Sequence, residues 1–255
     1  MTRLPEQVIQ AAMRYKLTIA YDGAAYCGWQ RQPDPVPTVQ RTIELAAGAI
    51  VSHPVTVAGS SRTDTGVHAR GQVAVMETTC DLEPQRLRMA INSRLPADIS
   101  IRQLEPCSAE FDVSRATCKR YRYLIWNQRD RPVFQRHYVY HYWHPLQIEP
   151  MRQACRQFLG GHDFMAFSSR TEDRLSTVRH IYHCDIGQRG PIMIFSVEGS
   201  GFLYHMVRNM VGTVVEVGRG HWPSDCIPRI LQSKDRSQAG PCAPAQGLCL
   251  QWIRF

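Results

Sequence analysis

The amino-acid sequence predicts an α+β protein of two similar lobes, each an antiparallel sheet with helices packed on one face. Two observations lead to this prediction. Strand-like runs and amphipathic helical runs are interleaved along the chain, and their order in residues 13–113 resembles their order in residues 114–255. A chain of 255 residues with 44% hydrophobic residues can also bury a sizeable core. We expect two domains with these bounds and a cleft between them.

In residues 13–113, alternation and turn residues predict four strands and two helices. Thr38 is a good N-cap, and apolar residues after it recur at helical spacing, so the first helix should end near Ser52. The second helix should cover Pro84–Leu95. The strands are expected at Tyr15–Tyr21, from Val55, at Gly71–Glu77 and at Ile99–Leu104.

In residues 114–255, the clearest signal is the run from Cys118 to Trp126, in which basic residues alternate with aromatic or apolar ones. This alternation predicts a strand with its basic residues on one face. The segment Gln135–His144 also alternates and is expected to be a strand. Further helices are expected at Pro150–Leu159 and Leu203–Val217, and further strands at Val178–Ile186 and Ile192–Glu198.

The balance of charges favours an anionic partner. The chain carries 30 Lys and Arg against 22 Asp and Glu, which gives a formal net charge of +8. The field of such a molecule attracts polyanions, and nucleic acid is the obvious candidate. A membrane surface would satisfy the same charge, but the sequence shows no apolar run long enough to span a membrane and no signal-peptide pattern at its start. We therefore expect no membrane partner.

The cysteines indicate a reducing compartment. All nine are scattered singly and form no CxxC pair, so we interpret them as reduced thiols that mostly fill the core. A cytoplasmic location is therefore expected.

One cluster of histidines raises the question of a metal site. His137, His141 and His144 have a spacing that could supply three ligands. The segment around them is more typical of a strand, and it contains no Asp, Glu or Cys to complete a coordination shell. We expect no metal here.

Polar and small residues concentrate between two apolar strands, in the segment Gly59–Ala69. Asp64 is flanked by Thr63 and Thr65 and followed by Gly66, so it can sit in a tight turn whose backbone amides hold the carboxylate still. Such a carboxylate could act as a nucleophile. The same pattern describes an ordinary Asx turn, and these residues alone leave both interpretations open.

The sequence SRTDTGVHARGQV, which begins at Ser61, resembles the catalytic motif of the TruA family of tRNA pseudouridine synthases. The family usually has GRTDAGVHA followed by GQV, so Ser61 replaces a glycine and Thr65 an alanine. The resemblance covers nearly the whole chain from about Met13, and we expect the first 12 residues to be disordered. Further matching stretches are Tyr26–Gln32 (YCGWQRQ), Lys119–Tyr123 (KRYRY), Phe202–Asn209 (FLYHMVRN) and Gln246–Leu250 (QGLCL).

The resemblance implies a reaction. Members of this family break the N1 glycosidic bond of a uridine, turn the uracil and rejoin it through C5, which gives pseudouridine. The resemblance identifies Asp64 as the essential nucleophile or base. A carboxylate suits either role because it can stabilise or trap positive charge at C1′, as carboxylates do in glycosidases. No cofactor is implied, and the active site would lie in the cleft between the lobes.

Two further catalytic residues follow from the resemblance. Arg208 is expected to pair with Asp64 and keep it ionised, because it lies away from the apolar stripe of the helix that begins at Leu203. Tyr121 is expected to stack on the flipped uracil, and its hydroxyl could assist proton removal at C5. Leu248 is expected to pack against the base. Without the resemblance, a surface arginine, a core tyrosine and a core leucine are the ordinary interpretations.

Basic residues are expected to bind the RNA phosphates. Arg62, beside the nucleophile, is the strongest candidate. On the helix that carries Arg208, Gly212 would let another backbone or the RNA approach closely. A single basic residue is nevertheless more often only solvated. The other candidates for substrate binding are Arg31, His68, Lys119, Arg120, Arg122 and His205.

The resemblance also implies the partners. The family acts on uridines 38, 39 and 40 of the anticodon stem-loop, where weak pairing lowers the cost of flipping a base, and it works as a homodimer in which one tRNA contacts both subunits. Two other classes of function remain open. A non-catalytic RNA-binding protein would explain the charge but not the set Asp64, Tyr121 and Arg208, and a metal-dependent RNA-processing enzyme would use the histidine cluster.

Overall fold

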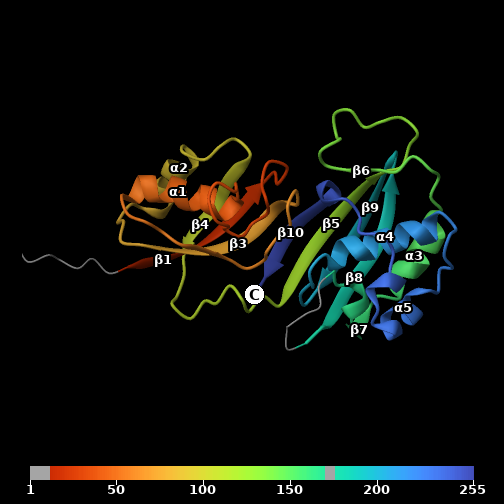
Figure 1. Ribbon diagram of the computed structural model, residues 1–255. Coiled ribbons are helices and arrows are strands. Elements are labelled where there is room, and N and C mark those ends of the chain that lie inside the picture. Colours follow the sequence, from red (N-terminus) through yellow and green to blue (C-terminus); the bar gives the residue numbers. More distant parts are fainter. Residues whose placement is uncertain (1–11, 170–175) are drawn as a thin grey trace, which may run out of the picture.

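The computed structural model describes residues 12–169 and 176–255 and contains an α+β fold (Figure 1). The strands are β1 (Met13–Tyr21), β2 (Val57–Gly59), β3 (His68–Thr78), β4 (Ile99–Pro106), β5 (Cys118–Trp126), β6 (Tyr140–His141), β7 (Gly160–Asp163), β8 (Val178–Arg189), β9 (Ile192–Gly199) and β10 (Leu248–Arg254). The helices are α1 (Val39–Val51), α2 (Pro84–Asn92), α3 (Ile148–Arg156), α4 (Met206–Gly218) and α5 (Ile227–Ser233), with short 3-10 helices at Met165–Phe167, Arg236–Gln238 and Ala245–Gly247.

The ten strands form one sheet, in which neighbouring strands follow the order β4-β1-β3-β10-β5-β9-β8-β7, with β2 beside β3 and β6 beside β5. This differs from the expected pair of separate sheets. The C-terminal strand β10 pairs in parallel with β3 and antiparallel with β5, so it joins strands from the two halves of the chain (Figure 1). Local alternation cannot reveal such a join, because it does not specify which distant strand lies alongside.

The helices cover the sheet in two groups (Figure 1). In the N-terminal half, α1 packs against α2 and α2 packs against β4, while in the C-terminal half α3 packs against α4 and β8. The buried side chains of both groups belong to one continuous hydrophobic core. Both halves of the chain therefore share one hydrophobic core on the sheet.

Most expected elements are present near their expected bounds. Thr38 precedes α1 in an extended conformation and Ser52 follows it in a left-handed one, as the helix prediction required, although Thr38 makes no side-chain capping bond. The strand predicted at Cys118–Trp126 is confirmed with these bounds. The short helix α5 was not anticipated.

Two expectations are wrong in detail. Only Tyr140 and His141 of the segment Gln135–His144 form a strand, because the preceding residues turn over the surface, where the Tyr138 amide bonds to the Gln135 carbonyl. Helix α4 begins at Met206 rather than Leu203, because His205 adopts a left-handed conformation with φ of 60°.

All nine cysteines are free, and three of them are buried. Within residues 12–169 and 176–255, none of the helices combines the length and the apolar character needed to cross a membrane. The expectation that the first 12 residues are disordered falls outside the described residues, apart from Ala12.

Candidate active site

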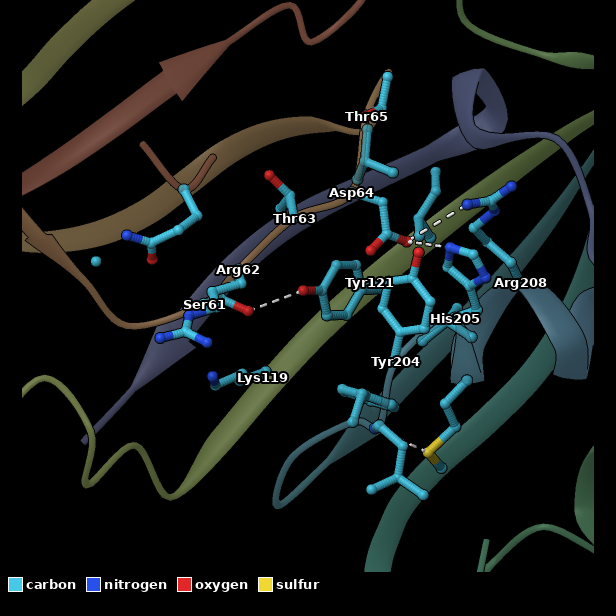
Figure 2. Close-up of a pocket in the computed structure, with 18 of the residues that line it drawn as sticks. Ser61, Arg62, Thr63, Asp64, Thr65, Lys119, Tyr121, Tyr204, His205 and Arg208 are labelled. Carbon is cyan, nitrogen blue, oxygen red and sulfur yellow. Dashed lines mark hydrogen bonds and ion pairs between the residues drawn. The ribbon is translucent and has the colours of Figure 1, made fainter. Parts of the chain in front are cut away.

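A pocket of about 920 Å³ lies over β5 and β10, the two strands at the centre of the sheet (Figure 2). Its walls come from the loop between β2 and β3, from β5, from the start of α4 and from the start of β10. Seven residues expected in the site line it: Arg62, Asp64, Lys119, Tyr121, His205, Arg208 and Leu248.

The loop that carries Asp64 is held by its backbone. The amide of Trp29 donates to the Thr63 carbonyl at 3.1 Å, and the amide of Val67 donates to the Asp64 carbonyl at 3.1 Å. Gly28 has φ of +88°, and a Cβ there would lie 2.6 Å from the Thr63 carbonyl oxygen, so the close approach of the two loops requires glycine. The turn thus fixes the position from which the Asp64 side chain extends.

The carboxylate of Asp64 faces two groups from the other half of the chain (Figure 2). Its Oδ2 atom is 3.4 Å from Nη1 of Arg208 and 3.7 Å from Nε2 of His205. The three side chains are only 20%, 15% and 19% exposed. The sequence pattern predicted that backbone amides hold the Asp64 carboxylate. In the structure, the guanidinium of Arg208 and the imidazole of His205 contact it. The partly desolvated cation stabilises negative charge on this oxygen more strongly than it would in open water.

Arg208 is oriented by the chain segment that leads to β10. Its Nε donates to the Ala243 carbonyl at 2.7 Å, while the Ala243 amide donates to the Arg208 carbonyl at 3.2 Å. That segment lies directly on α4, since a Cβ on Gly212 would be 1.6 Å from the Pro241 carbonyl oxygen. The expectation that Gly212 permits a close approach is therefore confirmed, and the approaching group is protein backbone.

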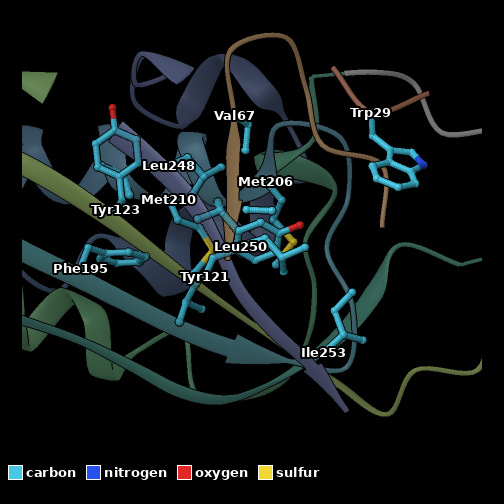
Figure 3. Close-up of a cluster of buried hydrophobic side chains, with 14 of the residues drawn as sticks. Trp29, Val67, Tyr121, Tyr123, Phe195, Met206, Met210, Leu248, Leu250 and Ile253 are labelled. Carbon is cyan, nitrogen blue, oxygen red and sulfur yellow. The ribbon is translucent and has the colours of Figure 1, made fainter. Parts of the chain in front are cut away.

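Tyr121 presents its hydroxyl beneath the same loop. The side chain is 6% exposed, its hydroxyl lies 3.0 Å from the Ser61 hydroxyl, and the Phe202 ring meets it edge-on at 5.3 Å. Burial raises the pKa of Tyr121 to about 12, with the Ser61 hydrogen bond opposing the rise and the Asp64 charge adding to it. Tyr121 is therefore a neutral phenol near pH 7. Leu248 and Leu250 pack in the same buried cluster (Figure 3).

Three basic residues surround the pocket. Arg62 is exposed beside Asp64, and Lys119 donates from Nζ to the Ser60 carbonyl at 2.7 Å. His205 is stacked by the ring of Tyr204, with ring centroids 3.8 Å apart. These groups give the rim of the pocket a positive potential.

Arg122 does not line the pocket, and neither do three other expected residues. Arg31 pairs with Glu44 at 3.5 Å and lies on a separate groove beside α1. Arg120 pairs with Glu198 of the neighbouring strand at 3.1 Å. Successive residues of a strand point to opposite faces, so Arg120 and Arg122 lie on the face away from Tyr121, and the basic residues of β5 do not share one face.

His68 is the third, and it is buried beneath the loops around the site. Its Nδ1 accepts from the Gly23 amide at 3.0 Å and lies 2.9 Å from Oδ1 of Asp22. Its Nε2 faces the carbonyls of His137 and Gln246 at 3.1 and 3.2 Å. His68 therefore ties together four chain segments rather than facing the pocket.

The sequence did not identify the polar residues that support the site. Gln72 is completely buried and hydrogen-bonds to both backbone polar groups of Ser61, and the Tyr21 hydroxyl lies 2.7 Å from the Thr63 hydroxyl. The available signals were the place of Thr63 and Gln72 within the matching motif and the departure from that motif at Ser61. Tyr204 lies in a matching stretch but carried no pattern of its own.

The histidine cluster does not form a metal site. His141 faces the Gln128 carbonyl at 3.0 Å, and His144 stacks on Trp143 with ring centroids 3.5 Å apart. Throughout the described ranges, no three His, Cys, Asp or Glu side chains form a group that could hold a metal ion.

Comparisons with known proteins identify the family of this chain. A family model described as tRNA pseudouridine synthase matches residues 17–114 and 154–255. The tRNA pseudouridine synthase A of Moorella thermoacetica is 41% identical over 243 residues, which cover 94% of this chain and 98% of that protein. The proteins of that name from Acetivibrio thermocellus and, as synthase A 1, from Bacillus cereus are 44% and 42% identical, over 94% and 95% of this chain and 98% of each relative. This chain therefore belongs to the tRNA pseudouridine synthase family.

Proposed function

We propose that this protein isomerises uridine to pseudouridine at positions 38, 39 and 40 in the anticodon stem-loop of tRNA. Membership of the family supports the reaction and the tRNA substrate. The observation that carries the proposal is the Asp64 carboxylate, which faces a pocket of about 920 Å³ beside Arg208 and Tyr121. A flipped nucleotide needs a pocket of this kind, because its reacting atoms are inaccessible within a base stack.

Asp64 attacks the nucleotide in this proposal. Its carboxylate is a nucleophile without a prior proton transfer, and it can trap positive charge that develops at C1′. The guanidinium of Arg208, 3.4 Å away, stabilises the negative charge before attack and holds the carboxylate in one orientation. A single carboxylate suffices because no water is activated and the released uracil stays in the pocket as the second reactant.

Tyr121 supports the uracil while it turns. An aromatic ring gives the flipped base a flat partner, and Leu248 packs at the start of β10 in the same pocket. Tyr121 carries its proton near pH 7, so its hydroxyl serves first as a hydrogen-bond donor or acceptor to the uracil. It can receive the C5 proton only if its own proton leaves.

RNA phosphates are proposed to contact Arg62, Lys119 and His205 at the rim of the pocket. Arg31, Arg120 and His68 do not line it, so a contact of these residues with RNA would have to lie outside the pocket. The halves 13–113 and 114–255 act as two lobes, with the active-site cleft where the pocket draws residues from both. A homodimer would present further basic surface to the same tRNA, and the nine free cysteines support a cytoplasmic location.

The test uses unmodified tRNA transcripts and the purified protein in an excess of chelator. Pseudouridine is detected at single positions by chemical labelling. Product confined to positions 38–40 and unaffected by the chelator supports the proposal. Product that disappears with the chelator would indicate a metal-dependent enzyme, and tRNA binding without product would indicate a binding protein.

A further inference from the structure

A buried chain of polar groups connects strand β3 to the hydroxyl of Tyr121. Gln72 is 0% exposed; its Oε1 accepts from the Ser61 amide at 3.2 Å and its Nε2 donates to the Ser61 carbonyl. The Ser61 hydroxyl, in a side chain that is 7% exposed, then lies 3.0 Å from the Tyr121 hydroxyl. The bond between Ser61 and Tyr121 therefore joins the N-terminal to the C-terminal half of the molecule (Figure 2).

The two bonds from Gln72 fix the backbone of Ser61 at both its amide and its carbonyl. A backbone held at both groups has little freedom to rotate, so strand β3 restrains the position from which the Ser61 side chain extends. Within the described residues, the Tyr121 hydroxyl is the hydrogen-bond partner of the Ser61 hydroxyl. The Ser61 hydroxyl is therefore placed to bond to the Tyr121 phenol.

The phenol also depends on this contact. Phe202 meets the Tyr121 ring from the edge, which restrains the ring but leaves its oxygen without a polar partner. A buried hydroxyl without a partner costs free energy and tends to shift towards any group that can bond to it, here the nearby Asp64 carboxylate. The Ser61 hydroxyl gives the Tyr121 oxygen a fixed polar partner.

We propose that Ser61 is a positioning residue, whose hydroxyl donates to the Tyr121 oxygen, anchors the ring and directs the Tyr121 proton into the pocket. The inference rests on the proposed role of Tyr121 in the reaction. The Ser61 contact also opposes the effect of burial on the pKa of Tyr121. Glycine, which the family motif usually carries at this position, cannot make the contact.

The experiment compares Ser61→Ala, which removes the hydroxyl, with Ser61→Thr, which retains it. Thr78→Val is the matched control, because Thr78 is a buried residue at the far end of β3 whose hydroxyl bonds to His53 and the Cys80 amide. Single-turnover rates of pseudouridine formation and dissociation constants for unmodified tRNA are measured for each variant.

Ser61→Ala should lower the single-turnover rate by about tenfold while the dissociation constant for tRNA stays within about twofold, because misplacement of a reacting group affects the chemical step. Ser61→Thr should keep most of the rate, and Thr78→Val should keep all of it. A wild-type rate for Ser61→Ala would overturn the inference. Equal losses in Ser61→Ala and Ser61→Thr would also overturn it, since loop packing rather than the hydroxyl would then be responsible.

Tyr121→Phe separates this inference from the proposed function. If Tyr121→Phe loses activity while Ser61→Ala does not, Tyr121 acts without Ser61 and only the inference fails. If Tyr121→Phe and Asp64→Asn both retain the wild-type rate, the proposed active site itself is wrong.

Discussion

Arg208 and Asp64 are 144 residues apart in the sequence, yet Nη1 of the arginine lies 3.4 Å from Oδ2 of the aspartate. The contact joins the loop before β3 to the first turn of α4, so it forms only when the two halves of the chain share one sheet. Both side chains are largely shielded from water, where their attraction is less screened than at an open surface. The pair therefore depends on the complete fold.

Asp64→Asn should abolish turnover and leave tRNA binding nearly unchanged. The amide has the shape of the carboxylate but is neither a nucleophile nor a negative charge, so we expect the rate to fall by roughly a thousandfold or more. Pseudouridine labelling gives the rate, and filter binding gives the affinity. Turnover retained in this variant would mean that Asp64 is not the reacting carboxylate.

Arg208→Lys should fail to replace arginine. The guanidinium donates from Nε to the Ala243 carbonyl at 2.7 Å while Nη1 faces Asp64, and a single ammonium cannot hold both positions in this geometry. We expect the single-turnover rate to fall about 10- to 100-fold, and further in Arg208→Met, which has no charge. A lysine variant as fast as the wild type would show that charge alone is needed.

The secondary structure could largely be predicted from the sequence, because alternation and helical spacing are local properties. The run Cys118–Trp126 and the helix after Thr38 illustrate this. The single sheet could not, since the pairing of β10 with β3 involves residues 181 positions apart and leaves no local pattern. The start of α4 was misplaced because helical spacing continues through His205, whose left-handed conformation the pattern cannot show.

The site was predicted only in part. The resemblance located Asp64, Tyr121 and Arg208, which the fold brings to one pocket. Charge alone was a poor guide to the RNA-binding residues. Arg120 forms an ion pair with Glu198 on the neighbouring strand β9, and only the strand register reveals this partner. The role of Gln72 was not anticipated, because the matching GQV stretch contains this residue but does not show that its buried amide holds Ser61.

Gly212→Ala should destabilise the protein. The added methyl would meet the Pro241 carbonyl oxygen at 1.6 Å, so the segment that holds Arg208 must move away from α4. We expect the free energy of unfolding to fall by about 1–3 kcal/mol, as overpacked sites do. Urea unfolding measures this, with Gly187→Ala as the control, because a Cβ on Gly187 meets nothing within 4 Å. Equal stability of the two variants would contradict the close packing of this segment.

The high pKa of Tyr121 predicts that this residue makes the protein less stable in alkali. Its phenol ionises near pH 10 when unfolded and at about 12 when folded, so the folded state binds more protons between these values and stability falls as the pH rises through them. The loss is about 1.4 kcal/mol per pH unit for one such group. Tyr121→Phe removes this contribution while the other buried tyrosines remain. The stability advantage of the wild type over Tyr121→Phe should therefore be constant from pH 7 to 9 and shrink from pH 10 to 11, as measured by urea unfolding at each pH. A constant difference over the whole range would mean that Tyr121 ionises as freely in the folded protein as in the unfolded chain.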